Sequence, residues 1–267
     1  MRLSNKVAVI TGGAQGFGAG IAKCLADEGC RCVIADINLE KAKETAAELN
    51  GLAVKADVTS KEDLNALCAA AMDTYGRLDI FIANAGILFS ASLEDMTLER
   101  FELVTKVNYT AFFQCAKAAA RVMRVQKEKY PDRTFDIIQI NSKSGLEGSN
   151  KNFAYAGSKF GGIGLVQSFA KELVEYGIKV NAVCPGNFLE GPLWMDTEKG
   201  LFGQYLNAGK VPGAKTVEDV KRFYEAKVPM NRGCYPIDVA RAVMYCVEQE
   251  YETGQAIPVT GGQNMLR

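Results

Sequence analysis

"VAVITGGAQGFGAGIAKCLADEG", residues 7–29, carries the patterns of a strand, a glycine-rich turn and a helix in one continuous stretch. Its first residues are apolar and either small or β-branched, which is typical of a strand covered on both faces. Gly12, Gly16 and Gly18 follow, and the residues after them have the apolar spacing of a helix. Glycines at this place let the backbone approach a diphosphate, and a helix N-terminus attracts its negative charge. The stretch therefore predicts a phosphate-binding turn after the first strand of an α/β domain.

The same alternation of strand and helix patterns continues along the 267 residues. Apolar runs predict strands at 6–11, 31–36, 52–58, 78–86, 135–142, 178–186 and 256–261. Amphipathic segments predict helices at 16–28, 39–49, 61–75, 97–127, 153–176 and 236–249. Repeated strand–helix–strand units imply right-handed crossovers. We therefore expect an α/β fold, a single domain over 1–267 with a doubly wound parallel sheet and helices on both faces.

Residues 187–235 break this rhythm, because they carry no strand pattern, several Gly and Pro, and the only tryptophan, Trp194. One part, TVEDVKRFYEAKV (216–228), resembles a helix. An insert after the sixth strand lies at the carboxyl edge of the sheet, where a lid over a substrate is expected. A peripheral segment that forms an oligomer contact is the alternative.

Composition excludes several function classes. Lys plus Arg and Asp plus Glu both number 31, so the net charge of zero favours neither nucleic acid nor an anionic membrane as a partner. The sequence has no run long enough to span a bilayer and no signal peptide pattern, and its eight scattered cysteines are typical of reduced thiols, so we expect a cytoplasmic protein. The absence of histidine excludes Ser-His-Asp and Cys-His catalysis and the usual zinc sites, and we expect no metal.

Without histidine, proton transfer near neutral pH requires another group with a shifted pKa. The stretch AYAGSKF (154–160) offers Tyr155 and Lys159, one helical turn apart. A free phenol has a pKa of about 10 and is a poor base at pH 7. A neighbouring ammonium would lower that pKa, so Tyr155 is a candidate general acid and base with Lys159 as its partner. A Tyr and a Lys at this spacing also occur by chance.

Asp36, at the end of the second predicted strand, indicates which dinucleotide binds. A carboxylate there accepts hydrogen bonds from the adenosine ribose hydroxyls and repels a 2′-phosphate. No basic residue follows it directly, since the next residues are Ile37 and Asn38, and position 13 is Gly. We expect NAD rather than NADP; an acidic cap for the next helix is the alternative role of Asp36.

Further motifs occur in a fixed order: Thr11-Gly-x-x-x-Gly-x-Gly18, Asn84-Ala85-Gly86, Asn108 in KVNYTAFF, Ser142 thirteen residues before Tyr155, Tyr155-x-x-x-Lys159, and Pro185-Gly186. With them the chain resembles the classical short-chain dehydrogenase/reductase family over nearly its whole length. The resemblance implies a Rossmann fold with seven strands in the order 3-2-1-4-5-6-7. It also implies NAD(P)-dependent oxidation of alcohols and a homodimer or homotetramer. An NAD-binding sensor without turnover would be expected to lose the Tyr or the Lys, and this chain has both.

The resemblance implies four catalytic residues. Tyr155 would be the acid and base, and Lys159 would tune it and bond the nicotinamide ribose. Ser142 would hold the substrate oxygen, and Asn108 would anchor a water relay from Lys159 to solvent. Each of two residues also has a purely structural alternative. Ser142 could be a turn residue at the end of a strand, and Asn108 could be a polar group inside a helix that bonds to the backbone.

The cofactor-binding residues follow from the same likeness. They are Gly12, Gln15, Gly16, Phe17, Gly18, Asp36, Ile37, Asp57, Val58, Asn84, Ala85, Gly86, Tyr155, Lys159, Pro185, Gly186 and Asn187. Asp57 and Val58 would face the adenine. The family often has a threonine that contacts the carboxamide where this chain has Glu190, so Asn187 and the backbone of Leu189 are candidates for that contact.

For the substrate, four stretches resemble a branch of the family that interconverts sorbitol 6-phosphate and fructose 6-phosphate with NAD. They are QINSKSG (139–145), KFGGIGLVQSFAKELVEYGIKV (159–180), VPMNRGC (228–234) and TGQAIPVTGGQ (253–263).

Ser142, Lys143, Tyr155 and Trp194 are the predicted substrate residues. Lys143 directly follows Ser142 and would meet a substrate phosphate, with Lys151 and Arg232 adding charge. Alternatively, Lys143 is solvated or pairs with Glu147. An unphosphorylated polyol or a hydrophobic alcohol such as a hydroxysteroid also remains open, the latter because an apolar set could line a pocket. That set comprises Phe153, Phe188, Leu193, Trp194 and Met195.

Overall fold

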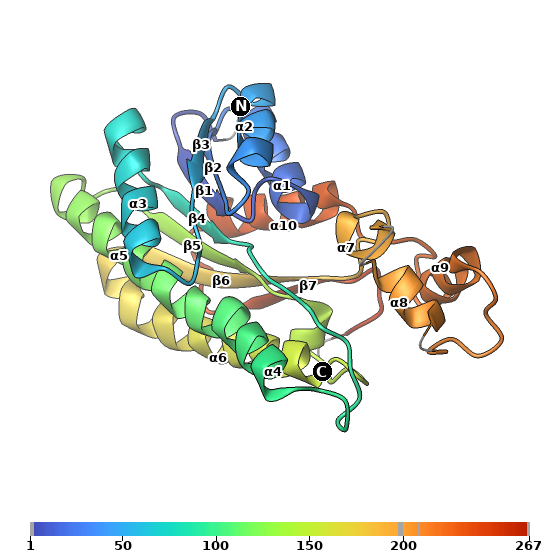
Figure 1. Cartoon of the computed structure of the whole chain (residues 1–267). Helices are drawn as coiled ribbons and strands as arrows, with labels where there is room; N and C mark the ends of the chain where they lie inside the picture. The colour runs from blue at the N-terminus through green and yellow to red at the C-terminus, as the bar shows by residue number, and fades with distance from the viewer. Residues whose placement is uncertain (1–2, 197–199, 208, 266–267) are drawn as a thin grey trace.

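The computed structural model describes residues 3–196, 200–207 and 209–265, and it shows one parallel sheet with helices on both faces (Figure 1). The seven strands lie in the order β3-β2-β1-β4-β5-β6-β7. Their bounds are β1 Val7–Thr11, β2 Arg31–Asp36, β3 Leu52–Lys55, β4 Ile80–Ala83, β5 Phe135–Ile140, β6 Ile178–Pro185 and β7 Ala256–Val259. All six pairings are parallel. The predicted fold class and strand order are confirmed.

The strand order reverses between β1 and β4, and this reversal positions the site. From β1 the chain builds outward to β2 and β3, then returns to place β4 on the other side of β1. The loops leaving the carboxyl ends of β1 and β4 therefore diverge and leave a crevice between them.

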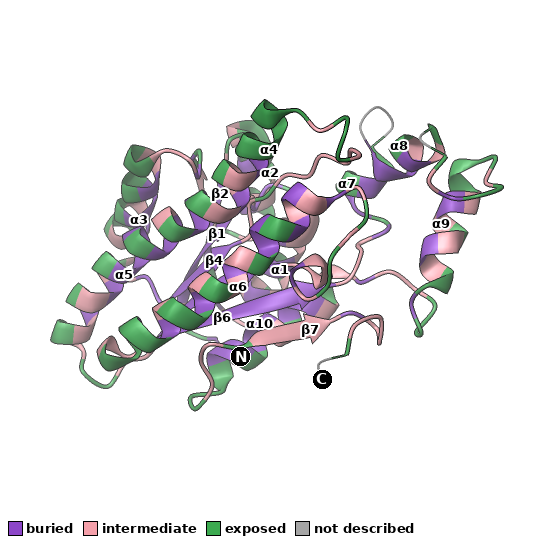
Figure 2. Ribbon diagram, turned by 90° about the horizontal axis from the view of Figure 1, so that it is seen from below, coloured by how far each residue is buried: buried purple, intermediate pink, exposed green. Residues whose placement is uncertain are grey.

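Apolar helix faces cover both faces of the sheet. On one face α1 (Gly16–Asp27), α2 (Leu39–Glu48) and α10 (Pro236–Glu248) pack on the strands. On the other, α3 (Lys61–Tyr75), α5 (Ala111–Lys129) and α6 (Phe153–Leu173) do so, with α4 (Leu98–Thr105) against α6. Figure 2 shows buried residues along the strands and on the inner sides of these helices. Strands hidden on both faces explain why their sequences are almost wholly apolar.

The predicted helix at 97–127 is interrupted. A π-helical turn, η1 (Lys106–Thr110), separates α4 from α5. Asn108 lies within this turn, buried, with its side-chain amide bonded to the backbone of Ile87. A π-helical turn adds one residue to the helix and so re-aims the side chains around it. The third and fourth strands are also shorter than predicted, because the residues that follow them leave the sheet to line the crevice.

The insert at 187–235 forms three short helices, α7 (Pro192–Met195), α8 (Leu201–Asn207) and α9 (Val217–Ala226), with no strand in its described residues. They have a small apolar core of their own, which contains Trp194, Tyr205 and Tyr224. The Trp194 ring centroid lies 5.6 Å from that of Tyr205 and 5.0 Å from that of Tyr224. The orange helices project beyond the sheet in Figure 1. This core holds the insert together.

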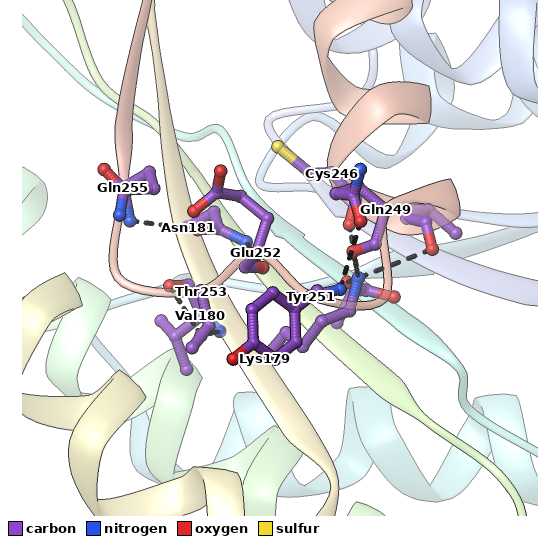
Figure 3. A network of polar contacts seen from close by, with 11 residues as sticks. Lys179, Val180, Asn181, Cys246, Gln249, Tyr251, Glu252, Thr253 and Gln255 are labelled. Carbon is purple, nitrogen blue, oxygen red and sulfur yellow. Dashed lines mark hydrogen bonds and ion pairs between the residues drawn. The ribbon is translucent and has the colours of Figure 1, made fainter.

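A buried lysine joins three elements at the amino ends of the strands (Figure 3). Lys179, at the start of β6, pairs with Asp136 of β5 at 3.0 Å. Its Nζ also donates to the carbonyls of Cys246 at 2.5 Å and Gln249 at 2.8 Å. A cation at this place satisfies carbonyls that the end of α10 leaves open. Burial nevertheless raises the pKa of the Asp136 carboxyl to about 6.

Candidate active site

A cleft of about 1250 Å³ opens at the carboxyl ends of the strands. The glycine-rich turn, the ends of β2, β4, β5 and β6, the first turns of α6, and the insert all contribute to it. All predicted cofactor residues except Gly18 line this cleft: Gly12, Gln15, Gly16, Phe17, Asp36, Ile37, Asp57, Val58, Asn84, Ala85, Gly86, Tyr155, Lys159, Pro185, Gly186 and Asn187. The predicted substrate residues, Ser142, Lys143, Tyr155 and Trp194, line the same cleft.

The glycine-rich turn requires its glycines. Gly12 and Gly16 have φ values of 60° and 62°, in the left-handed region that L side chains rarely adopt. Gly18 lies behind the turn, where a Cβ would come within 2.2 Å of the Gly12 carbonyl oxygen. No acidic residue stands in the first turn of α1, so its backbone N–H groups face the turn without a competing negative charge. This cradle fits the pyrophosphate of a dinucleotide.

Hydrogen bonds fix the Asp36 carboxylate at the rim of the cleft. It accepts from the backbone N–H of Ala14 at 3.2 Å and of Asn38 at 3.0 Å. The fixed carboxylate suits the ribose hydroxyls of an adenosine. One cation that the sequence analysis did not consider, Lys41, also lines the cleft and donates to Gln15 Oε1 at 3.3 Å.

Thr11 and Asn84 hold the two sides of the crevice together. The Asn84 amide donates to the carbonyls of Thr11 at 3.0 Å and Gly12 at 2.9 Å. In return, Thr11 Oγ1 accepts from the backbone N–H of Asn84 and Ala85. The end of β4 and the turn after β1 thus form one rigid unit. This explains why Thr11, which the sequence analysis treated only as the start of a motif, is buried.

Ser142 and Tyr155 meet at the ends of β5 and α6. The backbone N–H of Ser142 donates to the side chain of Asn141, and its Oγ accepts from the backbone N–H of Ser144. Burial raises the pKa of the Tyr155 phenol above its ordinary value of 10, and the nearby Ser142 side chain lowers it.

Lys159 lies deep beside Tyr155, with 4% of its surface exposed. Its Nζ donates to the carbonyl of Ile140 at 2.9 Å and lies 5.5 Å from the centre of the Tyr155 ring. Burial lowers the pKa of this ammonium to about 8. We expect Lys159, together with the positive charge of a bound oxidised nicotinamide, to lower the pKa of the phenol, and this stays a prediction. In the chain by itself, burial is the largest influence on the Tyr155 pKa and raises it.

Asn108 adjoins Lys159 through a small cavity of about 10 Å³, which both residues line. A cavity of this size admits about one water molecule. The Asn108 amide accepts from the Ile87 N–H at 2.8 Å and donates to the Ile87 carbonyl at 2.9 Å and to Ser158 Oγ at 3.3 Å. These bonds fix its orientation at the wall of the cavity.

Several expected substrate contacts do not reach the cleft. Arg232 is held in an ion pair with Asp238 at 2.6 Å, which keeps its guanidinium away. The Phe153 ring is tilted against that of Phe101, with ring centroids 6.4 Å apart. Leu189, whose backbone was a candidate for the nicotinamide carboxamide, is buried in the core of the insert. Lys151 and Met195 also lie outside the lining, whereas Phe188 and Leu193 belong to it.

The insert supplies cleft residues that the sequence analysis missed, among them Tyr205, Lys210, Tyr224 and Lys227. They lie 50 or more residues beyond Tyr155 in a segment without strand periodicity, so no pattern connected them to the site. The Asn152 amide, just before α6, donates to the Tyr205 hydroxyl at 3.2 Å. This bond joins the insert to the helix that carries Tyr155.

Comparisons with known proteins agree with this geometry. A family profile described as short chain dehydrogenase matches residues 6–200. The sorbitol-6-phosphate 2-dehydrogenase of Escherichia coli K12 is 39% identical over 98% of this chain and all of its own length. The galactitol 2-dehydrogenase of Agrobacterium fabrum is 34% identical over 99% of this chain and all of its own length. The crystal structure of a sorbitol-6-phosphate 2-dehydrogenase from Erwinia amylovora superimposes with a TM-score of 0.88 at 35% identity, covering 97% of this chain and all of that one.

The described residues were compared with the requirements of a membrane span and of a metal site. No helix among them is long and apolar enough to span a membrane. They contain no group of three or more Cys, Asp or Glu side chains arranged to hold a metal ion.

Proposed function

The chain belongs to the short-chain dehydrogenase/reductase family, and we propose that it transfers a hydride between sorbitol 6-phosphate and NAD, with fructose 6-phosphate as the ketone. Family membership establishes an oxidoreductase that acts on alcohols with a nicotinamide cofactor. The preference for NAD over NADP and the identity of the substrate as a sugar phosphate go beyond family membership and are what we propose. The observation that carries it is that Ser142, Tyr155 and Lys159 line the same cleft as the glycine-rich turn.

The cofactor would lie along the cleft with its pyrophosphate on the glycine-rich turn. Asp36 supports NAD, because its fixed carboxylate suits ribose hydroxyls and repels a 2′-phosphate. Asp57 and Val58 would flank the adenine. Lys159 would bond the nicotinamide ribose. Asn187 is the remaining candidate of the two named for the carboxamide, since the Leu189 backbone belongs to a buried residue outside the lining.

The proton chemistry belongs to Tyr155 and Ser142. In the oxidation, the Tyr155 oxygen takes the proton of the substrate hydroxyl while Ser142 holds that oxygen by a hydrogen bond. The phenol must first ionise, and burial opposes this. A bound oxidised nicotinamide would accept the hydride and add a positive charge beside the phenol. The chain's own contribution is to hold Tyr155 next to Ser142 and to keep an ammonium, Lys159, within reach of it.

Asn108 would anchor a water molecule that carries the proton from Lys159 towards solvent. The cavity that it shares with Lys159 has room for about one water molecule, which would accept a proton from the lysine. The alternative is that Asn108 only supports the π-helical turn. The variant Asn108→Ala separates the two roles. A relay predicts that kcat falls even where the melting temperature is unchanged, whereas a purely structural role predicts that kcat falls only as stability is lost.

The substrate assignment rests on likeness and charge. The E. coli relative is a sorbitol-6-phosphate 2-dehydrogenase, and Lys143 lines the cleft next to Ser142. An unphosphorylated polyol is the second candidate, favoured by the likeness to a galactitol 2-dehydrogenase. A hydrophobic alcohol is favoured only by the apolar lining at Phe188, Leu193 and Trp194.

We also propose that the chain assembles as a homodimer or homotetramer. The outer sides of α4, α5 and α6 expose three phenylalanines, Phe101, Phe113 and Phe160, by 40%, 44% and 46%. Exposed aromatic side chains gathered on neighbouring helices favour contact with a second copy. Sedimentation of the wild type and of a Phe113→Lys variant tests this.

The experiment for the function is a matched set of assays. Wild-type enzyme is given sorbitol 6-phosphate, sorbitol, galactitol and a hydroxysteroid, each with NAD and with NADP, and reduced cofactor is followed by absorbance. We expect the highest kcat/KM for sorbitol 6-phosphate with NAD. Tyr155→Phe should lower kcat by about 10²–10⁴-fold, and Tyr251→Phe, whose side chain is 99% exposed, is the control. A higher kcat/KM for any other alcohol, or retained turnover in Tyr155→Phe, would contradict the proposal.

A further inference from the structure

Three lysines from distant parts of the chain line the same cleft. Lys143 follows Ser142 in the turn after β5, Lys210 follows α8, and Lys227 follows α9. Only Lys143 was expected there. The other two come from the insert, which brings them to the cleft through its own small core.

Aromatic rings rather than carboxylates hold the two lysines of the insert. Lys210 Nζ lies 3.7 Å from the centre of the Tyr205 ring. Lys227 Nζ lies 4.1 Å from the centre of the Phe223 ring and 5.2 Å from that of Tyr224. A ring face attracts an ammonium without neutralising it, so the full charge stays available to an anion.

The three ammonium groups lie close enough to repel one another. Burial lowers the pKa of Lys210 to about 8, with further lowering by the charges of Lys227, Lys151 and Lys143. Burial also lowers the pKa of Lys143, with a smaller contribution from Lys227. Like charges placed together disfavour one another unless an anion lies between them.

Among the residues described, none of the three lysines pairs directly with a carboxylate. The ion pairs found in those residues involve none of the three lysines. Glu147 raises the pKa of Lys143 from a distance, and its carboxylate accepts a hydrogen bond from Asn264. In the described part of the chain, Glu147 is the one carboxylate that acts on the pKa of Lys143 or Lys210, so positive charge predominates where the three lysines meet the cleft.

The cluster lies beside the catalytic residues. Tyr205, on which Lys210 stacks, raises the pKa of Tyr155 by its proximity and is bonded to Asn152 at the start of α6. Lys143 is the neighbour of Ser142 in sequence. An anionic group bound by the lysines would thus belong to the same substrate molecule whose hydroxyl meets Tyr155.

We propose that Lys143, Lys210 and Lys227 form a phosphate subsite that binds the terminal phosphate monoester of the polyol. This rests on the proposed function and extends it, because the insert becomes the part of the chain that distinguishes phosphorylated from free substrate. In sorbitol 6-phosphate the phosphorylated carbon lies four carbon–carbon bonds from the carbon that is oxidised. Three ammonium groups suit a dianion, since each forms a charge-assisted hydrogen bond to a phosphate oxygen.

The test uses two variants and a matched control in the same insert. Lys210→Met and Lys227→Met keep the aliphatic stem and remove the charge, while Lys215→Met changes a lysine that is exposed and outside the cleft. We expect each cleft variant to lower the ratio of kcat/KM for sorbitol 6-phosphate over sorbitol by about tenfold or more, the loss typical of one charge-assisted contact. Lys215→Met should leave the ratio unchanged, and Lys210→Arg should restore most of it.

Binding of inorganic phosphate, measured by calorimetry, separates this inference from the proposed function. If the wild type binds phosphate and Lys210→Met does not, the subsite stands even where another phosphorylated alcohol proves to be the substrate. If the wild type oxidises polyols but does not bind phosphate, the subsite is wrong while the oxidoreductase function stands. Equal losses for sorbitol and sorbitol 6-phosphate in Lys210→Met and Lys227→Met would show a merely structural role and overturn the inference.

Discussion

Gly18→Ala should destabilise the fold and weaken dinucleotide binding at the same time. A Cβ at this position would lie 2.2 Å from the Gly12 carbonyl oxygen and 2.6 Å from Asn84 Nδ2. These two groups are bonded to each other at 2.9 Å, and Asn84 is bonded to Thr11 as well. A methyl group there can be accommodated only if the unit that joins β1 to β4 is forced apart.

The size of the effect follows from these contacts. Ordinary contact begins at 3.4 Å, so the Gly12 carbonyl or α1 must move by about 1.2 Å, the difference between 3.4 and 2.2 Å. Overpacking of this kind costs about 1–3 kcal/mol, and each lost hydrogen bond of Asn84 adds about 1 kcal/mol. We therefore expect a loss of roughly 2–5 kcal/mol in the free energy of unfolding. The melting temperature should fall by roughly 5–15 °C.

Urea unfolding followed by circular dichroism measures the stability, and calorimetric titration with NAD measures the binding. The control is Gly164→Ala in α6, where the glycine is exposed and an added Cβ would meet nothing within 4 Å. That variant should gain about 0.5–1 kcal/mol, because alanine favours the helix over glycine. If Gly18→Ala proves as stable as Gly164→Ala and binds NAD as the wild type does, the close packing behind the turn is not what the site requires.

Three further predictions follow from single contacts. Asp36→Ala should raise the ratio of kcat/KM with NADP over that with NAD by about tenfold or more, because a charge at close range is removed and Lys41 already lines the cleft; an unchanged ratio would contradict this role of Asp36. Lys159, whose pKa falls to about 8 on burial, contributes stability that is present above pH 10.5 and is lost as the pH falls through 8. The free energy of unfolding of Lys159→Met minus that of wild type should therefore be larger by about 2 kcal/mol at pH 7 than at pH 9.5, so that the variant is relatively more stable at pH 7, and a difference that does not change with pH would refute it. Lys179→Met should lower the free energy of unfolding by about 3–5 kcal/mol because it leaves the Asp136 carboxylate buried without its partner; urea unfolding should show the double variant Asp136→Asn/Lys179→Met to be more stable than Lys179→Met, and additive losses would argue against the pair.

Local patterns were sufficient for the α/β fold class, and the resemblance to the family supplied the strand order and most of the cleft residues. Strands buried on both faces must be apolar, and the glycines of the turn need φ values that other residues avoid. The strands and the glycine-rich turn can therefore be predicted from the sequence. The ends of parallel strands meet at one edge of the sheet. The resemblance to the family predicted that residues as distant as Asp36, Asn84 and Ser142 share a site, and this geometry explains why they line one cleft.

Only the tertiary structure determined the charges and protonation around that cleft. The burial of Tyr155, which raises its pKa, depends on tertiary neighbours such as Cys184 of β6 and Tyr205 of the insert, and the spacing of Tyr155 and Lys159 on one helix does not reveal it. Arg232 pairs with Asp238 and lies outside the cleft lining, whereas the packing of the insert places Lys210 and Lys227 in that lining. Electrostatic effects depend on distance and burial in space, and neither is encoded in the separation of residues along the chain.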